Sequence, residues 1–218
     1  GLRHIADVVV HPVTIKQLMD EGFLSRPTYY SPSFVDLSKV KVDKSTGDYN
    51  NKDLGDAMKQ SKVYGDIVSH YQRLCNGEPA VAFAINIEHS NMLVERFEEA
   101  GIPARHVEAD TPDTERAEAI ADLQSGKIKV LSNVGILCTG VDIPFLKAVI
   151  LARPTKSYNL HTQQIGRGTR ATPTKSTFTV LDHANNLMEH GFIENEKECH
   201  LDGEEPKKKA DPGEKRPT

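Results

Sequence analysis

Short apolar segments alternate with amphipathic ones between residues 80 and 181, and this alternation limits the possible folds more than any other feature of the sequence. The run Ala80–Ile85 is apolar at every position, which is typical of a strand buried on both faces of a parallel sheet. Further strands are predicted at 104–107, 128–131, 148–151 and 177–181, with helices at 89–100, 114–124 and 157–165. Strands that alternate with helices across short connections predict an α/β fold with a parallel sheet flanked by helices.

The residues before and after this core domain, which we place at 77–182, are less regular. Residues 1–76 are expected to form lead-in strands and helices that pack on the core. The elements expected there are a strand at 6–10, a capped helical turn at 14–21 closed by Gly22, extended chain at 29–32 and 35–37, a polar turn at 44–48 and a long or broken helix at 51–75. Residues 183–202 would form a helical extension. The segment 203–218 is charged and contains prolines without apolar periodicity, which predicts a linker or tail.

The composition is that of a soluble globular protein, with 38% hydrophobic and 27% charged residues. No apolar run reaches membrane-spanning length and the start lacks a signal-peptide pattern, so we expect no membrane partner and a cytoplasmic location, with nucleoid association if the source is bacterial. The net charge of -4 disfavours nucleic-acid binding by bulk charge but permits a local basic groove. The three cysteines and nine histidines lack disulfide or metal-ligand spacing, so reduced thiols and no metal site are expected.

The segment Gln163–Arg170 carries two arginines three residues apart, which predicts that both lie on one face of a helix. Gly166, directly before Arg167, leaves room for a close approach. The guanidinium group suits phosphate because its planar fork donates paired hydrogen bonds and stays protonated. We interpret the segment as a phosphate-facing edge; a solvated helix face with ordinary surface arginines is the alternative.

Ligands of open parallel sheets bind beyond the carboxyl ends of the strands, and three loops predicted there carry polar residues. The first is 86–90, in which Ser90 could cap the following helix. The second is 132–144, where Asp142 could accept hydrogen bonds from a ribose hydroxyl or an arginine and Gly140 could let a backbone amide face a phosphate. A plain helix C-cap at Gly140 is the alternative. The third is 152–157, which adds the cations Arg153 and Lys156 near the same edge.

These motifs resemble those of the second RecA-like domain of superfamily 2 helicases and translocases. Residues 163–170 match the Q-x-x-G-R-x-x-R motif of that family, and 139–144 match its T-G-x-D-x-P motif. Ala82-Phe83, followed by a polar turn and a helix, resembles the motif on its first strand. The order and spacing agree over residues 78–182. Weaker similarity in 1–50 and 181–191 points toward DEAD/DEAH-box DNA repair helicases of bacteria and phages.

The resemblance implies a RecA-like sheet of the P-loop NTPase superfamily and a role for each motif residue. Arg170 would be the arginine finger at the γ-phosphate of ATP, and Arg167 would contact the same phosphates or organise the motif. Gln163 would help position the attacking water or bridge to the nucleotide. Asp142 would lie near the ribose. The resemblance also places Gly140 and Gly166 on the nucleotide side, and the residues expected to hold the sugar-phosphate backbone are Asn86, Ser132, Asn133 and Thr139.

The sequence contains neither a G-x-x-x-x-G-K-S/T phosphate loop nor a D-E-x-D or D-E-x-H acidic box. We therefore expect ATP and Mg²⁺ to be held mainly by an N-terminal RecA-like domain of the same parent chain, and this chain alone to be inactive. The predicted function is the C-terminal motor domain of an ATP-dependent helicase acting on single-stranded or duplex nucleic acid, with DNA favoured. The alternative is a non-catalytic nucleic-acid-binding or protein-docking module derived from such a domain.

Overall fold

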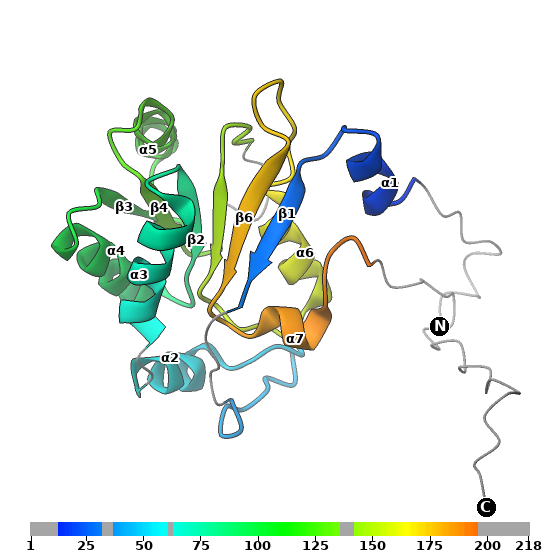
Figure 1. The fold of residues 1–218 in the computed structure, drawn as a ribbon. Coiled ribbons are helices and arrows are strands. Elements are labelled where there is room, and N and C mark those ends of the chain that lie inside the picture. Colours follow the sequence, from blue (N-terminus) through cyan, green and yellow to red (C-terminus); the bar gives the residue numbers. More distant parts are fainter. Residues whose placement is uncertain (1–12, 32–36, 61–62, 136–141, 196–218) are drawn as a thin grey trace, which may run out of the picture.

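Six strands, all parallel, form the central sheet in the computed structural model, which describes residues 13–31, 37–60, 63–135 and 142–195 (Figure 1). Across the sheet the strands lie in the order β1 (Arg26–Tyr30), β6 (Thr177–Asp182), β5 (Ala148–Leu151), β2 (Ala80–Phe83), β4 (Val130–Asn133) and β3 (Ala104–Val107). The predicted α/β class with a parallel sheet is therefore confirmed.

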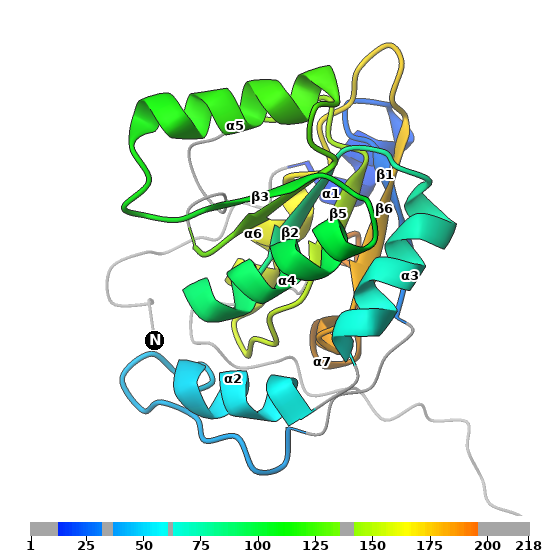
Figure 2. The ribbon, with the colours of Figure 1, turned by 90° about the vertical axis from the view of Figure 1, so that its left-hand side faces the viewer.

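Helices cover both faces of this sheet because successive strand residues point to opposite sides. On one face, Ala80 and Ala82 of β2 pack with α3 (Val63–Cys75) and α4 (Ile87–Glu99). On the other face, Val81 and Phe83 belong to a buried cluster that also includes residues of α1 (Ile15–Asp20), α5 (Asp113–Ser125) and α6 (Tyr158–Gly166). Two short elements complete the described fold: α2 (Asn51–Gln60), which lies below both helix layers in Figure 2 and buries Leu54 in the core, and α7 (Asn186–His190). Every helix within the described residues is too short or too polar to span a bilayer.

Helix ends follow from local capping chemistry. Thr14 and Gln17 form a capping box that starts α1, as the sequence predicts. The cap of α4 is Asn86, whose side chain accepts a hydrogen bond from the His89 amide at 2.8 Å, so the interpretation of Ser90 as the cap is wrong. Gly126 ends α5 in the left-handed conformation that favours glycine.

The lead-in segment contributes a strand to the sheet. Strand β1 pairs in parallel with β6 from Arg26↔Thr177 to Tyr30↔Leu181, so the sheet continues across the boundary predicted at residue 77. The predicted extended chain at 29–30 is thus an edge strand, and the predicted helix at 51–75 is broken into α2 and α3. The predictions for 6–10 and 203–218 fall outside the described residues.

The connections give the sheet two chemically different ends. Because the strands are parallel, each crossover helix must carry the chain from the end of one strand back to the start of the next. In Figure 1 the arrowheads of β1 and β6 point toward α7 and α2, and the loop that leads into β6 lies at the opposite end. We call the end where the strands finish the carboxyl end of the sheet and the other the amino end.

Candidate nucleotide and nucleic-acid sites

The predicted site residues divide between the two ends of the sheet. Asn86 follows β2 at the carboxyl end. Asp142 precedes β5, and Arg170 follows α6 and forms an antiparallel bridge with Leu24 just before β1, so this pair lies at the amino end. The expectation that the arginine segment joins the strand-end loops at one edge is therefore wrong, because α6 returns the chain along the sheet before Arg170 is reached.

An exposed ion pair connects the two longest motifs. The Nε atom of Arg170 lies 3.2 Å from Oδ1 of Asp142, and the two side chains are 63% and 60% exposed. Ion pairs this exposed are weak because water screens them. A phosphate or a ribose hydroxyl could therefore compete for either partner, as the role predicted for each requires.

The two arginines do not share a helix face. Helix α6 ends at Gly166, Arg167 is its C-cap residue with φ -63°, and Arg170 lies beyond the helix. Gln163 is exposed on α6. A Cβ atom added to Gly166 would meet nothing within 4 Å, so the space that the sequence predicts at this glycine is present.

The backbone around Arg170 is held by Ser25, which sequence reasoning missed. The Ser25 amide donates to the Thr169 carbonyl at 2.7 Å, and its Oγ lies 3.1 Å from the carbonyl oxygens of Arg170 and of Lys175. Ser25 is completely buried. No motif marks it, because its role depends on the long-range pairing of β1 with β6.

A buried lysine supports the same site. Lys175 is 2% exposed, and its Nζ donates to the Pro144 carbonyl at 3.1 Å. Burial, reinforced by the charge of Lys147 and opposed by that of Asp142, lowers the Lys175 pKa to about 8. The contact joins the turn after Arg170 to the segment that carries Asp142. In the sequence, Lys175 stands in a polar turn and is indistinguishable from a surface lysine.

Two residues predicted to hold nucleic acid are inside the protein. Ser132 and Asn133 are completely buried in β4; the Ser132 hydroxyl lies 2.6 Å from that of Ser90, and Asn133 donates to the Ala82 carbonyl at 2.9 Å. We therefore withdraw the predicted nucleic-acid contacts of Ser132 and Asn133, because their polar groups form hydrogen bonds inside the protein. Asn86 is partly exposed, whereas Thr139 and Gly140 lie outside the described residues.

The cations at the carboxyl end are anchored by a lead-in carboxylate. Oδ1 of Asp48 accepts from the amides of Tyr49 at 2.9 Å and Lys156 at 2.7 Å. Oδ2 accepts from the Thr155 hydroxyl at 2.8 Å and from Arg153 at 3.4 Å. The Lys156 ammonium also lies 5.1 Å from the centre of the Tyr49 ring. Among the described residues, no three potential metal ligands cluster.

Comparison with known proteins identifies the family. Residues 64–172, half of the chain, match the helicase conserved C-terminal domain. The chain belongs to this family. It is 36% identical over 192 residues to a 51.5 kDa protein of a Lactococcus phage, which covers 88% of this chain and 42% of the phage protein. It is also 29% identical to a Saccharomyces cerevisiae protein that carries the name of an ATP-dependent helicase, IRC3, over 84% of this chain and 27% of the yeast protein.

A solved structure agrees with this assignment at the level of the fold. The ATP-dependent type ISP restriction-modification enzyme LlaBIII bound to DNA superimposes with a TM-score of 0.57 and 21% identity over 78% of this chain and 13% of the enzyme. Together, the family match and this fold confirm the predicted RecA-like fold of a superfamily 2 helicase C-terminal domain. The chain spans less than half the length of the two relatives described above.

Proposed function

We propose that this chain is the second motor domain of an ATP-dependent superfamily 2 helicase or translocase, with Arg170 as its arginine finger. The observation that carries the proposal is the exposed Arg170–Asp142 ion pair, in which the two family motifs meet at the amino end of the sheet. The buried side chains of Ser25 and Lys175 hydrogen-bond to the backbone carbonyls of Arg170 and of Pro144, and so hold the two segments that carry this pair. An arginine on a fixed backbone with an exposed, exchangeable partner suits transition-state stabilisation.

In the proposed mechanism, Arg170 exchanges its carboxylate partner for phosphate. ATP with Mg²⁺ is held by another RecA-like domain, which brings the γ-phosphate to the amino end of this sheet when the domains close. Arg170 and Arg167 then neutralise the charge that develops as water attacks the γ-phosphorus and the bond to the β-phosphate breaks. Gln163 orients that water. Asp142, released from Arg170, accepts hydrogen bonds from the ribose, while Gly166 leaves room for the nucleotide.

The groups for Mg²⁺ and for the phosphate loop come from outside this sequence. No phosphate-loop or acidic-box motif occurs in its 218 residues. We propose that the missing groups belong to an N-terminal RecA-like domain of the same parent chain, since this chain spans only 42% of its phage relative. The substrate is single-stranded or duplex nucleic acid, in the cytoplasm or on a bacterial nucleoid. DNA is favoured because the weaker sequence similarity in 1–50 and 181–191 points toward DNA repair helicases.

Substitution of Arg170 tests the finger. We expect Arg170→Ala, made in the protein that includes the phosphate-loop domain, to lower nucleic-acid-stimulated ATP turnover by about 3 orders of magnitude or more, because a finger contributes roughly 3 to 5. The matched control is Arg96→Ala, since Arg96 is 55% exposed on α4 and also pairs with a carboxylate, Glu99, at 2.8 Å. Turnover of Arg170→Ala within about tenfold of the control would refute the assignment.

The absence of a phosphate loop also favours a second candidate, a nucleic-acid-binding or docking module without ATP turnover. This candidate predicts that the full polypeptide binds nucleic acid yet shows no stimulated ATPase. The same measurement on the unsubstituted protein separates the two, because only the motor domain requires turnover.

A further inference from the structure

Lead-in residues form an outer layer over the carboxyl end of the sheet. Residues 41–50 fold into a hairpin in which Val42 and Tyr49 form an antiparallel bridge and the Asn50 amide donates to the Lys41 carbonyl at 2.8 Å. The turn uses Gly47 at φ 70°. Helix α2 follows at once, with the Asn50 side chain accepting from the amides of Lys52 at 3.0 Å and Asp53 at 3.2 Å. We call residues 41–57 the carboxyl-end cap.

Buried contacts fix the cap to the loops at the strand ends. Asp48, 8% exposed, makes the hydrogen bonds to the loop 153–156 described above. Leu54 of α2 is completely buried in the core. Beside it, Gly55 approaches the strand-end loop so closely that an added Cβ would lie 3.1 Å from Nδ2 of Asn86. The cap is therefore a packed part of the domain that lies directly on the loop after β2.

This placement changes which residues a ligand at the carboxyl end would meet. The strand-end side chains of Ser132 and Asn133 are buried, and Asn86 is used as the cap of α4 with α2 beside it. A nucleic-acid strand that crosses this end of the sheet would run over the outer face of the cap.

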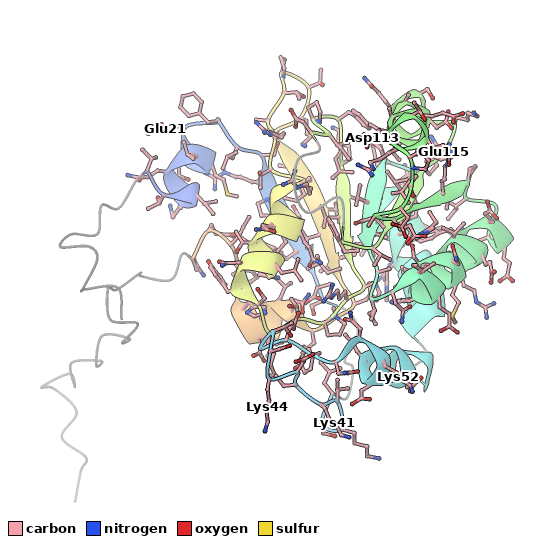
Figure 3. The ribbon with its side chains drawn as sticks, turned by 180° about the vertical axis from the view of Figure 1, so that it is seen from behind. Glu21, Lys41, Lys44, Lys52, Asp113 and Glu115 are labelled. Atoms are coloured by element: carbon pink, nitrogen blue, oxygen red, sulfur yellow. The ribbon has the colours of Figure 1, made fainter. Side chains whose placement is uncertain are left out.

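The outer face presents three lysines. Lys41, Lys44 and Lys52 are exposed, and in Figure 3 their side chains project from the cap away from the sheet. None of the three forms an ion pair with a carboxylate of the described residues. The nearest acids along the hairpin are engaged, because Asp48 is buried and Asp43 accepts from the amide and hydroxyl of Ser45 at 2.8 and 2.7 Å.

Three exposed acidic side chains lie far from the lysines of the cap. In Figure 3 the acidic side chains of Glu21, Asp113 and Glu115 lie at the end of the molecule opposite the three lysines. The cap contains three lysines and four aspartates (Asp43, Asp48, Asp53 and Asp56), a formal net charge of -1, so it would act through individually placed ammonium groups and not through bulk charge.

We propose that the outer face of the carboxyl-end cap is a nucleic-acid-binding surface, on which Lys41, Lys44 and Lys52 contact the phosphates of one strand. The proposal rests on the proposed function, because it takes nucleic acid to be the substrate of the domain. An ammonium group binds phosphate as a point charge and reads no base, so the contact is independent of sequence. It supplies the strand contacts that the buried Ser132 and Asn133 cannot make.

The test measures how salt affects binding of a fluorescent mixed-sequence single-stranded DNA to the 218-residue chain. We expect Lys41→Gln/Lys44→Gln/Lys52→Gln to flatten the slope of log K against log salt by about 2, since each lost phosphate contact removes about 0.7. At low salt the affinity should fall by about tenfold or more. The matched control is Lys16→Gln/Lys127→Gln/Lys129→Gln, which removes equal charge from α1 and from the chain before β4.

The outcomes separate this inference from the proposed function. Equal weakening by both triple variants would show a bulk-charge effect and overturn the inference, as would wild-type affinity of the cap variant. Tighter binding by the cap variant would also overturn it, because the lysines would then be excluding the strand. If the unsubstituted chain binds neither DNA nor RNA of any strandedness, nucleic-acid binding itself fails together with the cap.

Discussion

Two glycines of the arginine motif have opposite surroundings at the residue scale. A Cβ added to Gly168 would lie 2.2 Å from two ring carbons of Phe178, whereas one added to Gly166 would meet nothing within 4 Å. Gly168 therefore lets the chain that carries Arg170 lie directly on the ring of β6. The motif letters alone do not show this, because both positions are glycine.

Alanine substitutions at these two positions should differ in sign. Gly168→Ala forces the chain off Phe178, so we expect a loss of about 1 to 3 kcal/mol in the free energy of unfolding. Gly166→Ala adds a methyl group in open space at the end of α6 and restricts the unfolded chain, so a gain of about 0.4 to 1 kcal/mol is expected. Urea unfolding of both variants measures the difference. Similar losses at both positions would contradict the packing described for Gly168.

At the scale of secondary-structure elements, the sequence predicts those strands and helices that form because of their own local composition. Strands β2 and β5 were identifiable because every residue in them is apolar, and α1 because Thr14 and Gln17 form a local capping box. The end of β4 was missed because Ser132 and Asn133 are polar side chains satisfied by partners distant in sequence. The place of β1 beside β6 was missed for the same reason, since strand pairing is not local.

The site was predictable only in part because its geometry depends on topology. Motif spacing identifies Arg170 and Asp142, and the structure brings them together. Arg170 lies at the amino end because α6 returns the chain along the sheet, and Asp142 lies there because it precedes β5. Ser25 and Lys175 carry no motif, and only the folded chain places them beneath the arginine segment.

The hairpin should detach from the sheet when its buried carboxylate is removed. Asp48→Ala leaves the Thr155 hydroxyl, the Lys156 amide and the Arg153 guanidinium without their acceptor, and each such unsatisfied group costs about 1 to 3 kcal/mol if it stays buried. Local opening is the cheaper response, so we expect faster proteolytic cleavage within residues 41–57. Asp43→Ala, in the exposed turn of the same hairpin, is the control. Equal cleavage of both variants would show that Asp48 does not anchor the cap.

On the scale of the whole molecule, the two proposed sites lie at opposite ends of one rigid sheet. Between Arg170 at the amino end and the cap at the carboxyl end run strands whose residues in β2, β4 and β5 are all buried. A packed sheet of this kind moves as a unit. In the proposed motor, closure of the nucleotide cleft would therefore displace the nucleic-acid surface directly, without any rearrangement inside the domain.

Buried histidines should make the stability of this unit fall in mild acid. His89 is 2% exposed, and its Nδ1 accepts a hydrogen bond from the Ile85 amide at 3.3 Å. Protonation of Nδ1 would turn this acceptor into a donor that faces the Ile85 N–H group. Burial lowers the His89 pKa to about 4 from the ordinary value of 6.5. Above pH 6.5 the side chain is neutral in both the folded and unfolded states, so its titration does not change the free energy of unfolding. Below it, the unfolded chain binds the proton first, so folding stability is lost as the pH falls from 6.5 toward 4.

The size of the effect follows from the same pKa difference. At about 1.4 kcal/mol per pH unit, His89 alone should remove roughly 3 kcal/mol from the free energy of unfolding between pH 6.5 and 4. His89→Gln keeps an acceptor for the Ile85 amide but cannot titrate. Urea unfolding of both proteins at pH 7 and pH 4, at constant ionic strength, should therefore show the smaller acid-induced loss in the variant. Parallel losses in the two proteins would mean that the acid sensitivity arises elsewhere, for example at His183, whose pKa burial and the nearby His70 lower to about 3.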